Sequence, residues 1–527
     1  MRQNYWRIFA TAVIKNWNKP ALTDYYLSDD GYKDLQNLSY SYGEMCREML
    51  RLREVFQLIG LKKGDHVAIC GANCTHWIIA YLAIVAYQGV VVTILNVQST
   101  EDIAHQIDFS DAKLLIADSE VWMNLKKHSL PNIQCVISMD DWSICHSNLK
   151  RIQTGTLPMR KHRNSFILML LNLWRMYVSF SRKHPNDLSV ICFTSGSTSN
   201  AKGVMVAHRV YPAGGALLLS RLRAPIDNRN VMAILPFGHV FGLVDVNSAL
   251  YSGSHVFIVK SIIHPSTLIK SMMHIRPYRI MLIPMLVDGL IAAGKEDLLR
   301  HCSEFLKYGI AGGAVVPSET IEKLLSINFP ITIGYGQTEA SPLISISSPS
   351  KYKKGSCGQV IPNCKVCISP EGEILVKGDN VMLGYYKDPE ATAAKIDSDG
   401  WLHTGDKGHL DEDGYLYVEG RLEQDIIVLP NGENIRPDNI ESLINALPEV
   451  SESLVLARDG HLVAIVVPES PYTIHHTPYT EVADLRRKIL RAVNPSLPLF
   501  SQLYDVEIID TPLQRTEKQT IKRYLYK

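Results

Sequence analysis

Short runs of β-branched residues alternate with longer apolar stretches of helical length in the first part of the chain. Residues 66–71 (HVAICG) precede 76–89 (HWIIAYLAIVAYQG), and residues 90–96 (VVVTILN) precede 99–111 (STEDIAHQIDFSD) and 113–118 (KLLIAD). This alternation is typical of βαβ units, in which a crossover helix joins two parallel strands. It therefore predicts an α/β fold with parallel sheets and covering helices.

The pattern changes after residue 354. Glycine-punctuated short strands are expected in residues 372–386 and 408–421, which is typical of a small antiparallel, barrel-like subdomain. From Leu422 onward a further strand-and-helix unit begins. A chain of 527 residues has room for several domains of about 100–200 residues. We expect a large N-terminal domain over residues 1–422 and a small α+β C-terminal domain over residues 423–527.

The charge balance and the cysteines restrict the partners and the compartment. The chain carries 54 Lys and Arg against 53 Asp and Glu, so it has no net field to attract nucleic acid, and we expect no nucleic-acid partner. Its ten cysteines are scattered, which suits a reducing cytoplasm better than a disulfide framework. Cys364 and Cys367 form a Cys-x-x-Cys pair, but Cys357 alone does not complete a zinc site. We expect strand cysteines in a cytoplasmic protein.

Two short apolar segments raise the question of a membrane. The first, at the N-terminus, lacks the small-residue cleavage site of a signal peptide and is closed by Lys15 and Asn16, so we expect a surface helix. The second, residues 166–180 (FILMLLNLWRMYVSF), contains Arg175 and is shorter than the ~20 apolar residues that span a bilayer. It fits a connecting helix docked on the protein better than a peripheral helix in contact with a membrane surface.

Residues 193–203 (FTSGSTSNAKG) gather hydroxyl groups and glycine around Lys202, directly after an apolar run. A Walker-type P-loop needs glycine immediately before the lysine and Ser or Thr immediately after it. Ala201 and Gly203 occupy those positions, so the Walker interpretation fails. The segment can still surround phosphate oxygens with hydroxyl and backbone N–H groups, and Lys202 supplies a mobile cation.

This segment resembles the phosphate-binding signature of the adenylate-forming superfamily, which includes acyl-CoA synthetases, carrier-loading adenylation domains and firefly luciferases. The other motifs of that superfamily follow in its order: LPFGHVFG (235–242), GIAGGAVV (309–316), GYGQTEAS (334–341), GWLHTGDKGHLDEDGYLYVEGR (400–421) and DIIVLPNGENIRPDNIE (425–441). The last motif looks most like the fatty-acyl-CoA synthetase branch. The resemblance implies a large N-terminal domain and a small mobile C-terminal domain that rotates between two half-reactions about a hinge at Glu423.

The resemblance implies a two-step reaction: an ATP-dependent ligase converts a carboxylic acid to acyl-AMP with release of pyrophosphate, and a thiol then displaces AMP. Both reactants of the first step are anions, so the site must supply Mg²⁺ and hydrogen-bond donors. Glu339 matches the magnesium ligand of the family, with Thr194 assigned to the same ion, and hard oxygen donors suit that ion. Thr338 is expected to donate its hydroxyl to the α-phosphate.

Other residues match the nucleotide site of the family. Tyr335 corresponds to the aromatic residue that packs on the adenine, and Gly312 and Gly313 let the backbone approach the base. Asp406 is expected to accept hydrogen bonds from the ribose hydroxyls, and Arg421 to donate to ribose or phosphate. The remaining residues that the resemblance places at the nucleotide are Thr194, Ser195, Gly196, Ser197, Thr198, Lys202, Gly336, Gln337 and Thr338.

The sequence departs from the family pattern in two places. Ser199 and Ala201 replace the usual glycine and proline of the phosphate loop without removing a donor. More seriously, the C-terminal signature reads LQRTEKQTIKR, and Thr520 stands where the family has the lysine that bridges the acyl carboxylate and the α-phosphate. We expect Lys518 to supply that cation, with Lys522 as the alternative. Otherwise the protein is an acyl-AMP-binding homologue that is either impaired in adenylation or non-catalytic.

His239 and Gly313 are expected to line the acyl pocket. Members of the superfamily that activate α-amino acids carry aspartate at the position of His239, where it pairs with the substrate ammonium. Without that carboxylate, a buried ammonium would be unpaired at a cost of several kcal/mol, so a fatty or aryl acid is expected. Coenzyme A is the expected acceptor, and the phosphopantetheine thiol of an acyl-carrier protein is the alternative.

Overall fold

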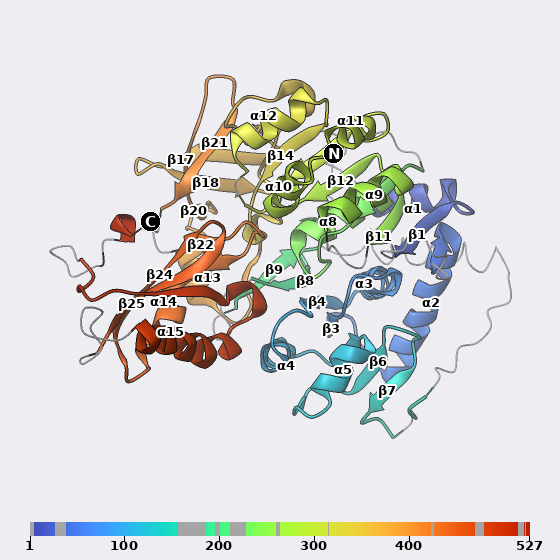
Figure 1. Cartoon of the computed structure of the whole chain (residues 1–527). Helices are drawn as coiled ribbons and strands as arrows, with labels where there is room; N and C mark the ends of the chain where they lie inside the picture. The colour runs from blue at the N-terminus through green and yellow to red at the C-terminus, as the bar shows by residue number, and fades with distance from the viewer. Residues whose placement is uncertain are drawn as a thin grey trace. The chain divides into compact units, whose positions relative to one another are not determined.

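The structure is a computed structural model of the chain. It describes residues 5–26, 38–150, 152–155, 186–194, 201–210, 228–259, 264–314, 316–422, 426–469, 479–514, 521 and 523–526. The chain divides into a larger unit, formed by most of residues 1–420, and a smaller unit that includes the chain from Arg421 onward (Figure 1). The domain boundary between residues 422 and 423 stays a prediction.

The first sheet of the larger unit contains the alternating segments of the N-terminal sequence. Its elements are β3 (His66–Cys70), α3 (Thr75–Tyr87), β4 (Val90–Ile94), α4 (Thr100–Phe109), β5 (Leu114–Ala117), α5 (Ser119–Leu125), β6 (Cys135–Ser138), β7 (Ile144–Ser147), β8 (Leu188–Phe193), β9 (Gly203–Ala207) and β19 (Gly384–Tyr385). Its described strands run in the order β19-β9-β8-β4-β3-β5-β6-β7. The central strands β8, β4, β3, β5 and β6 are parallel, as the alternation predicts.

The second sheet has the described order β16-β15-β14-β13-β12-β10-β11-β1-β2. Its strands are β1 (Pro20–Tyr25), β2 (Ser39–Ser41), β10 (Asn230–Ala233), β11 (His255–Val259), β12 (Arg279–Leu282), β13 (Tyr308–Ala311), β14 (Ile331–Tyr335), β15 (Ser345–Ile346) and β16 (Gln359–Val360). The run from β1 to β14 is parallel, and β2, β15 and β16 add antiparallel strands at the two ends. The α/β class is thus confirmed in both sheets.

Helices cover these sheets because their apolar residues have to be buried. They are α1 (Tyr5–Lys15), α2 (Tyr42–Ile59), α8 (Val240–Tyr251), α9 (Pro265–Ile275), α10 (Pro284–Ala292), α11 (Glu296–Cys302) and α12 (Ser318–Ser326). Helix α8 packs on β11 (Figure 1) and on β10, and α9 also packs on β10. Helix α3 is apolar on nearly every face and is buried almost throughout, as expected for a helix inside a large core.

An antiparallel sheet follows in the chain, where the sequence predicts a small barrel-like subdomain. It has the described order β17-β18-β20-β21, with β17 (Cys364–Ile368), β18 (Glu373–Gly378), β20 (Leu402–Leu410) and β21 (Leu416–Arg421), and α13 (Pro389–Lys395) precedes β20. Cys364 and Cys367 lie in β17, as predicted, and the ten cysteines are free thiols. Within the described ranges, no group of three or more His, Cys, Asp or Glu side chains is arranged to hold a metal by itself.

The smaller unit is an α+β structure. Its elements are β22 (Ile427–Val428), β23 (Asn434–Ile435), α14 (Pro437–Asn445), β24 (Val450–Arg458), β25 (His461–Pro468), α15 (Tyr479–Val493) and β26 (Leu503–Ile508). Helix α14 packs on β24 and α15 packs on β26, over a buried apolar cluster that includes Ile440, Ile489 and Val506. The α+β character predicted for the C-terminal part is therefore observed.

The structure describes one of the two apolar segments that were considered for membrane contact. The N-terminal segment forms helix α1, in which Phe9 and Val13 are buried and Ile14 is exposed. Residues 166–180 lie outside the described residues. In the part of the chain that the structure describes, no helix is both long enough and apolar enough to cross a bilayer.

Candidate active site

The two ends of the FTSGSTSNAKG segment meet at the neck of a β-hairpin. Strands β8 and β9 pair antiparallel with Phe193 opposite Gly203. The N–H of Thr194 donates to the carbonyl of Lys202 at 3.0 Å, and the N–H of Lys202 donates to Oγ1 of Thr194 at 3.2 Å. These bonds hold Thr194 and Lys202 together at the base of the predicted phosphate loop. The other predicted loop residues lie outside the described residues: Ser195, Gly196, Ser197 and Thr198.

Three of the sequence motifs contact one another at Gly312, just after strand β13. A Cβ atom at this position would lie 2.9 Å from the carbonyl oxygen of Gly334 and 3.3 Å from the ring of Phe241. Only glycine therefore lets the segments 235–242, 309–316 and 334–341 approach this closely. The next residue, Gly313, has φ +90°, a conformation that favours glycine. Their predicted role at the adenine remains a prediction.

Tyr335 and Asp406, which the sequence assigns to adenine and ribose, are hydrogen-bonded to each other. Tyr335 ends β14, Asp406 lies in β20, and the tyrosine hydroxyl donates to Oδ2 of the aspartate at 2.7 Å. Asp406 is buried, so this charge-assisted bond stabilises a carboxylate that has little access to water. The structure thus brings the two predicted nucleotide residues into one place.

Neighbouring residues hold the backbone beside Asp406. Oε1 of Glu373 accepts the N–H of Gly405 at 2.8 Å, and its other oxygen lies 2.8 Å from Nδ1 of His403. The hydroxyl of Thr404 donates to the carbonyl of Ile374 at 2.6 Å and accepts the N–H of Asp406 at 3.0 Å. Sequence reasoning missed Glu373, because its approach depends on the pairing of β18 with β20. The predicted ribose ligand therefore sits on a braced strand.

Burial and the nearby Asp406 carboxylate also affect Cys357. Burial is the main cause that raises the pKa of this thiol to about 11, and the negative charge of Asp406 adds to the effect, while a backbone hydrogen bond from Val418 opposes it. Cys357 is therefore a neutral thiol near pH 7. Because the thiolate is the reactive form, a nucleophilic role for Cys357 is not supported.

Glu339 lies on a short 3-10 turn, η1 (Thr338–Ala340), that follows β14. The chain turns tightly at Gly336, where a Cβ atom would lie 1.6 Å from the carbonyl oxygen of Pro342. Gln337 then donates from Nε2 to the carbonyl of Thr404 at 3.5 Å, and the carbonyl of Glu339 accepts the N–H of Met382 at 2.9 Å. The turn that carries Thr338 and Glu339 is thus tied to segments that lie far away in the sequence.

Tyr385 connects Glu339 to the phosphate loop. Its hydroxyl donates to Oε1 of Glu339 at 2.7 Å, and the ammonium of Lys202 lies 4.9 Å from the centre of its ring. A cation at this distance from a tyrosine ring makes a favourable cation–π interaction. Sequence reasoning missed Tyr385, which lies 46 residues from Glu339. Tyr385 thus contacts both Glu339, the predicted magnesium ligand, and Lys202, the predicted phosphate-binding cation.

The carboxylate of Glu339 has the chemistry of a ligand for a magnesium ion that also binds substrate phosphates. Mg²⁺ is usually held by one or two carboxylates with phosphate oxygens and water, and not by an all-protein cage. Oε1 of Glu339 accepts the Tyr385 hydroxyl, while Oε2 makes no hydrogen bond or ion pair with the described part of the chain. Glu339 and the hydroxyl of Thr194 would hold the ion, which would neutralise phosphate charge there.

His239, the predicted acyl-pocket residue, stands at the N-cap of α8 with an extended backbone. The segment before it is clamped, because Asn73 accepts the N–H of Phe237 at 2.9 Å and donates to the carbonyl of Leu235 at 2.8 Å. The hydroxyl of Thr93 donates to the carbonyl of Gly238 at 2.9 Å. These bonds define the position of His239, and its predicted contact with the acid remains a prediction.

The predicted residues of the C-terminal part are outside these observations. Arg421 ends β21, and its side chain is not among those described. Glu423, Lys518 and Thr520 lie outside the described residues. Their assigned roles as hinge residue, catalytic cation and substituted lysine therefore stay predictions.

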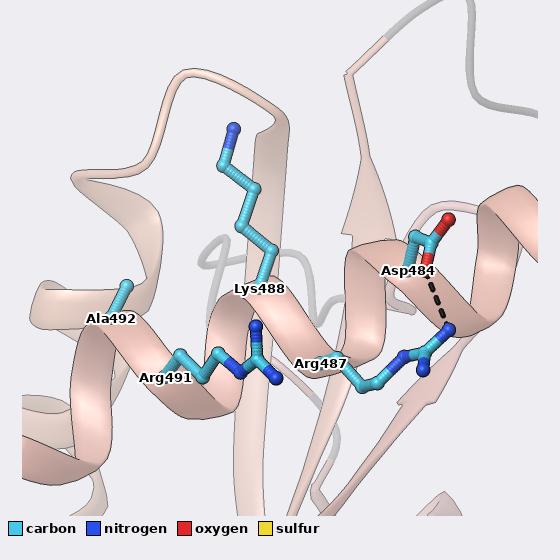
Figure 2. A pocket seen from close by; sticks show the side chains of 5 residues that line it. All are labelled: Asp484, Arg487, Lys488, Arg491 and Ala492. Carbon is cyan, nitrogen blue, oxygen red and sulfur yellow. Dashed lines mark hydrogen bonds and ion pairs between the residues drawn. The ribbon is translucent and has the colours of Figure 1, made fainter.

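Helix α15 of the smaller unit borders an open hollow of about 450 Å³ (Figure 2). It is lined by Asp484, Arg487, Lys488, Arg491 and Ala492. Arg487 pairs with Asp484, and Lys488 lies 2.5 Å from Glu449. Basic side chains near the C-terminus of a helix interact favourably with the partial negative charge at that end. None of the motif residues lines this hollow, so the candidate site rests on the motif residues described above.

The comparison with known families covers nearly the whole sequence. A model described as AMP-binding enzyme matches residues 9–386, and a model described as AMP-binding enzyme C-terminal domain matches residues 424–526. These two matches include the motifs of the candidate site except residues 400–421, which lie between the two matched ranges.

Individual relatives are more distant. The chain is 25% identical to 4-coumarate–CoA ligase 1 of Solanum tuberosum, over 79% of this chain and 76% of the relative. It is 30% identical to 3-[(3aS,4S,7aS)-7a-methyl-1,5-dioxo-octahydro-1H-inden-4-yl]propanoyl:CoA ligase of Rhodococcus jostii, over 75% of this chain and 76% of the relative. Among solved structures, a double mutant of o-succinylbenzoate CoA synthetase from Bacillus subtilis has a TM-score of 0.75 at 22% identity and covers 99% of this chain and 98% of its own. This last similarity supports the fold.

Proposed function

The chain belongs to the AMP-binding enzyme family, and on that premise we propose that it is an AMP-forming acid–thiol ligase. In the first step a carboxylate oxygen attacks the α-phosphorus of ATP, the bond to the β-phosphate oxygen breaks, and pyrophosphate leaves. In the second step the thiol of coenzyme A attacks the acyl carbon and AMP leaves with the bonding electrons. The relatives named as CoA ligases support this reaction.

The observation that carries the proposal is the clustering of the residues assigned to nucleoside and phosphates. Tyr335, bonded to Asp406, and Glu339, bonded to Tyr385, are four residues apart in the chain. Four residues span at most about 14 Å even when fully extended. The groups assigned to ribose and to the phosphates are therefore close enough to bind one nucleotide.

For the acid, we propose an aryl or fatty carboxylate. The position at which amino-acid-activating members carry aspartate is His239, and a neutral imidazole offers no charge to pair with an ammonium. The two relatives are named for 4-coumarate and for a bicyclic propanoate, neither of which carries an amine. Both names agree with a pocket for a largely apolar acid.

Two features of the proposed reaction involve the C-terminal part. We infer that residues 423–527 form a domain that rotates about Glu423 between the half-reactions, and that Lys518 supplies the cation for adenylation. Thr520 at the usual lysine position supports a second candidate, an acyl-AMP-binding homologue that adenylates poorly, because threonine brings no charge to the developing phosphate charge.

Pyrophosphate release with a panel of aryl, fatty and amino acids, with and without coenzyme A, tests the proposal. We expect release with an aryl or fatty acid and thioester formation when coenzyme A is added. Thioester formed only from supplied acyl-AMP would instead favour the adenylation-impaired homologue. In that case Thr520→Lys should restore the first step, whereas Lys518→Ala should abolish adenylation if Lys518 already supplies the cation.

The acceptor is tested separately. Coenzyme A and the phosphopantetheine arm of an acyl-carrier protein present the same thiol, so thioester formation is measured with each at equal concentration. Faster turnover with coenzyme A supports the ligase proposed here. If the carrier protein supports turnover and coenzyme A does not, the acceptor is the carrier protein and not coenzyme A.

A further inference from the structure

Tyr385 contacts two charged groups of the candidate site from opposite ends of its side chain. Its hydroxyl donates to Glu339 at 2.7 Å, and the Lys202 ammonium lies 4.9 Å from the centre of its ring. Donation to a carboxylate increases the electron density of the phenol ring, which strengthens the attraction of the ring for a cation. The two contacts therefore support each other.

Strand pairing places Tyr385 beside the phosphate loop. Strand β19 pairs antiparallel with β9, with Tyr385 opposite Val204, two residues after Lys202. The N–H of Tyr386 also donates to the carbonyl of Gly203 at 2.7 Å. Lys202 directly precedes β9 and Tyr385 lies in the neighbouring strand β19, so their contact follows from the backbone register.

The backbone around Tyr385 is held on its other side as well. The N–H of Tyr385 donates to the hydroxyl of Thr392 at 2.8 Å. Downstream, Tyr386 and Lys387 donate to the carboxylate of Asp111 at 2.8 and 2.9 Å. Burial acts to raise the pKa of Asp111, but these two hydrogen bonds hold it below its ordinary value. The phenol of Tyr385 is therefore presented from a braced segment.

We propose that Tyr385 is a positioning residue that orients Glu339 toward the magnesium ion of the adenylation reaction; this inference rests on the proposed function. A free glutamate side chain samples many rotamers, and holding one oxygen reduces the entropy lost when the other oxygen binds. The hydroxyl engages Oε1 and presents Oε2 to the cation. The ring meanwhile keeps the Lys202 cation near the same carboxylate.

Tyr385→Phe isolates the hydroxyl, because the ring under Lys202 is kept. The primary readout is Mn²⁺ affinity, measured by electron paramagnetic resonance of the free ion in the presence of a non-hydrolysable ATP analogue. We expect the dissociation constant for Mn²⁺ to rise about two- to tenfold, the effect of having to immobilise one flexible side chain when the ion binds. The Mg²⁺ concentration that half-saturates pyrophosphate release should rise similarly, while kcat at saturating Mg²⁺ changes little.

Two further variants separate positioning from a general loss of structure. Tyr386→Phe is the matched control, since it removes the neighbouring hydroxyl while Lys387 still holds Asp111, and its Mn²⁺ affinity should equal that of the wild type. Tyr385→Leu removes the ring as well and should additionally raise the KM for ATP, because Lys202 loses its support. Thermal unfolding is measured for all variants, and the comparison uses those that keep the wild-type Tm.

The outcomes distinguish this inference from the proposed function. Wild-type Mn²⁺ affinity and Mg²⁺ dependence in Tyr385→Phe would overturn the positioning role, as would equal losses in Tyr385→Phe and Tyr386→Phe. A wild-type protein that fails to bind Mn²⁺ with the ATP analogue would overturn it too. If the wild type binds Mn²⁺ together with the ATP analogue, but none of the tested acids supports pyrophosphate release from ATP, the proposed reaction is wrong. The Mn²⁺ comparison then still decides the role of Tyr385.

Discussion

The clearest prediction concerns the carboxylate assigned to the ribose. Asp406→Asn keeps the size and shape of the side chain and removes its charge. Asp406 is 6% exposed and accepts the Tyr335 hydroxyl at 2.7 Å. The asparagine can still accept from Tyr335 through its amide oxygen, so the strand and its bracing by Glu373 and Thr404 should persist. The change therefore tests the charge at the site more than the fold.

The expected loss of ATP affinity follows from the hydrogen bonds at stake. A hydrogen bond to a charged group contributes about 1.5–3 kcal/mol, and each 1.4 kcal/mol is about a tenfold change in Kd. If the ribose hydroxyls donate to Asp406, the Kd for ATP should rise about 10- to 150-fold. Because Asp406 is bonded to Tyr335 whereas Glu339 is bonded to Tyr385, the effect should fall on nucleotide binding and not on the metal.

Titration calorimetry with ATP and Mg²⁺ measures this change, and Tyr335→Phe is its control. That variant keeps the ring assigned to the adenine and removes only the donor to Asp406, so it should lower the free energy of unfolding by about 1–3 kcal/mol and alter the Kd less than Asp406→Asn does. The double variant should lose less affinity than the sum of the two single losses, because the two residues share one bond. Wild-type ATP affinity in a folded Asp406→Asn protein would refute the ribose assignment.

Three further predictions concern the metal, the core and the pH dependence of stability. Glu339→Gln should reduce pyrophosphate release by orders of magnitude at an unchanged Tm, because the amide binds Mg²⁺ poorly; unchanged release would remove Glu339 from the metal site. Arg279→Met leaves the buried Asp245 carboxylate without the partner that lies 2.8 Å away, and denaturant unfolding should show a loss of about 3–5 kcal/mol; a loss below about 1 kcal/mol would contradict this. Burial lowers the pKa of His255 to about 4, so the neutral form is favoured in the folded state: the stabilisation is complete above the unfolded pKa of about 6.5 and should fall by about 2 kcal/mol between pH 7 and pH 5. His255→Gln should flatten this part of the pH profile, and an unchanged slope would show that His255 is not the cause.

Local patterns in the sequence were sufficient for the fold class. The β-branched runs at residues 66–71, 90–96 and 113–118 became the parallel strands β3, β4 and β5, because a strand buried on both faces requires continuous apolar residues. Helix α3 was also predictable. It has 13 mostly apolar residues between two parallel strands, and parallel strands are usually connected by a crossover helix. The cysteines of β17 likewise followed from the absence of a second ligand pair.

The order of the motifs was also sufficient to identify the family and to select Tyr335, Glu339 and Asp406. What the sequence could not provide was the set of contacts among them. Tyr335 and Asp406 lie 71 residues apart, and Glu339 and Tyr385 lie 46 residues apart. Tyr385 and Glu373 were missed for this reason, because neither carries a local signal of its role.

The sequence by itself thus determined the parallel character of the central strands and proposed candidate site residues, because hydrophobic periodicity and motif spacing act over short stretches of chain. Only the tertiary structure decided that the hydroxyl of Tyr385 reaches Glu339 while its ring lies near Lys202. That meeting depends on the pairing of β19 with β9. Strand order and register are settled by the packing of the whole sheet, and an alternating pattern within one strand does not encode its neighbour.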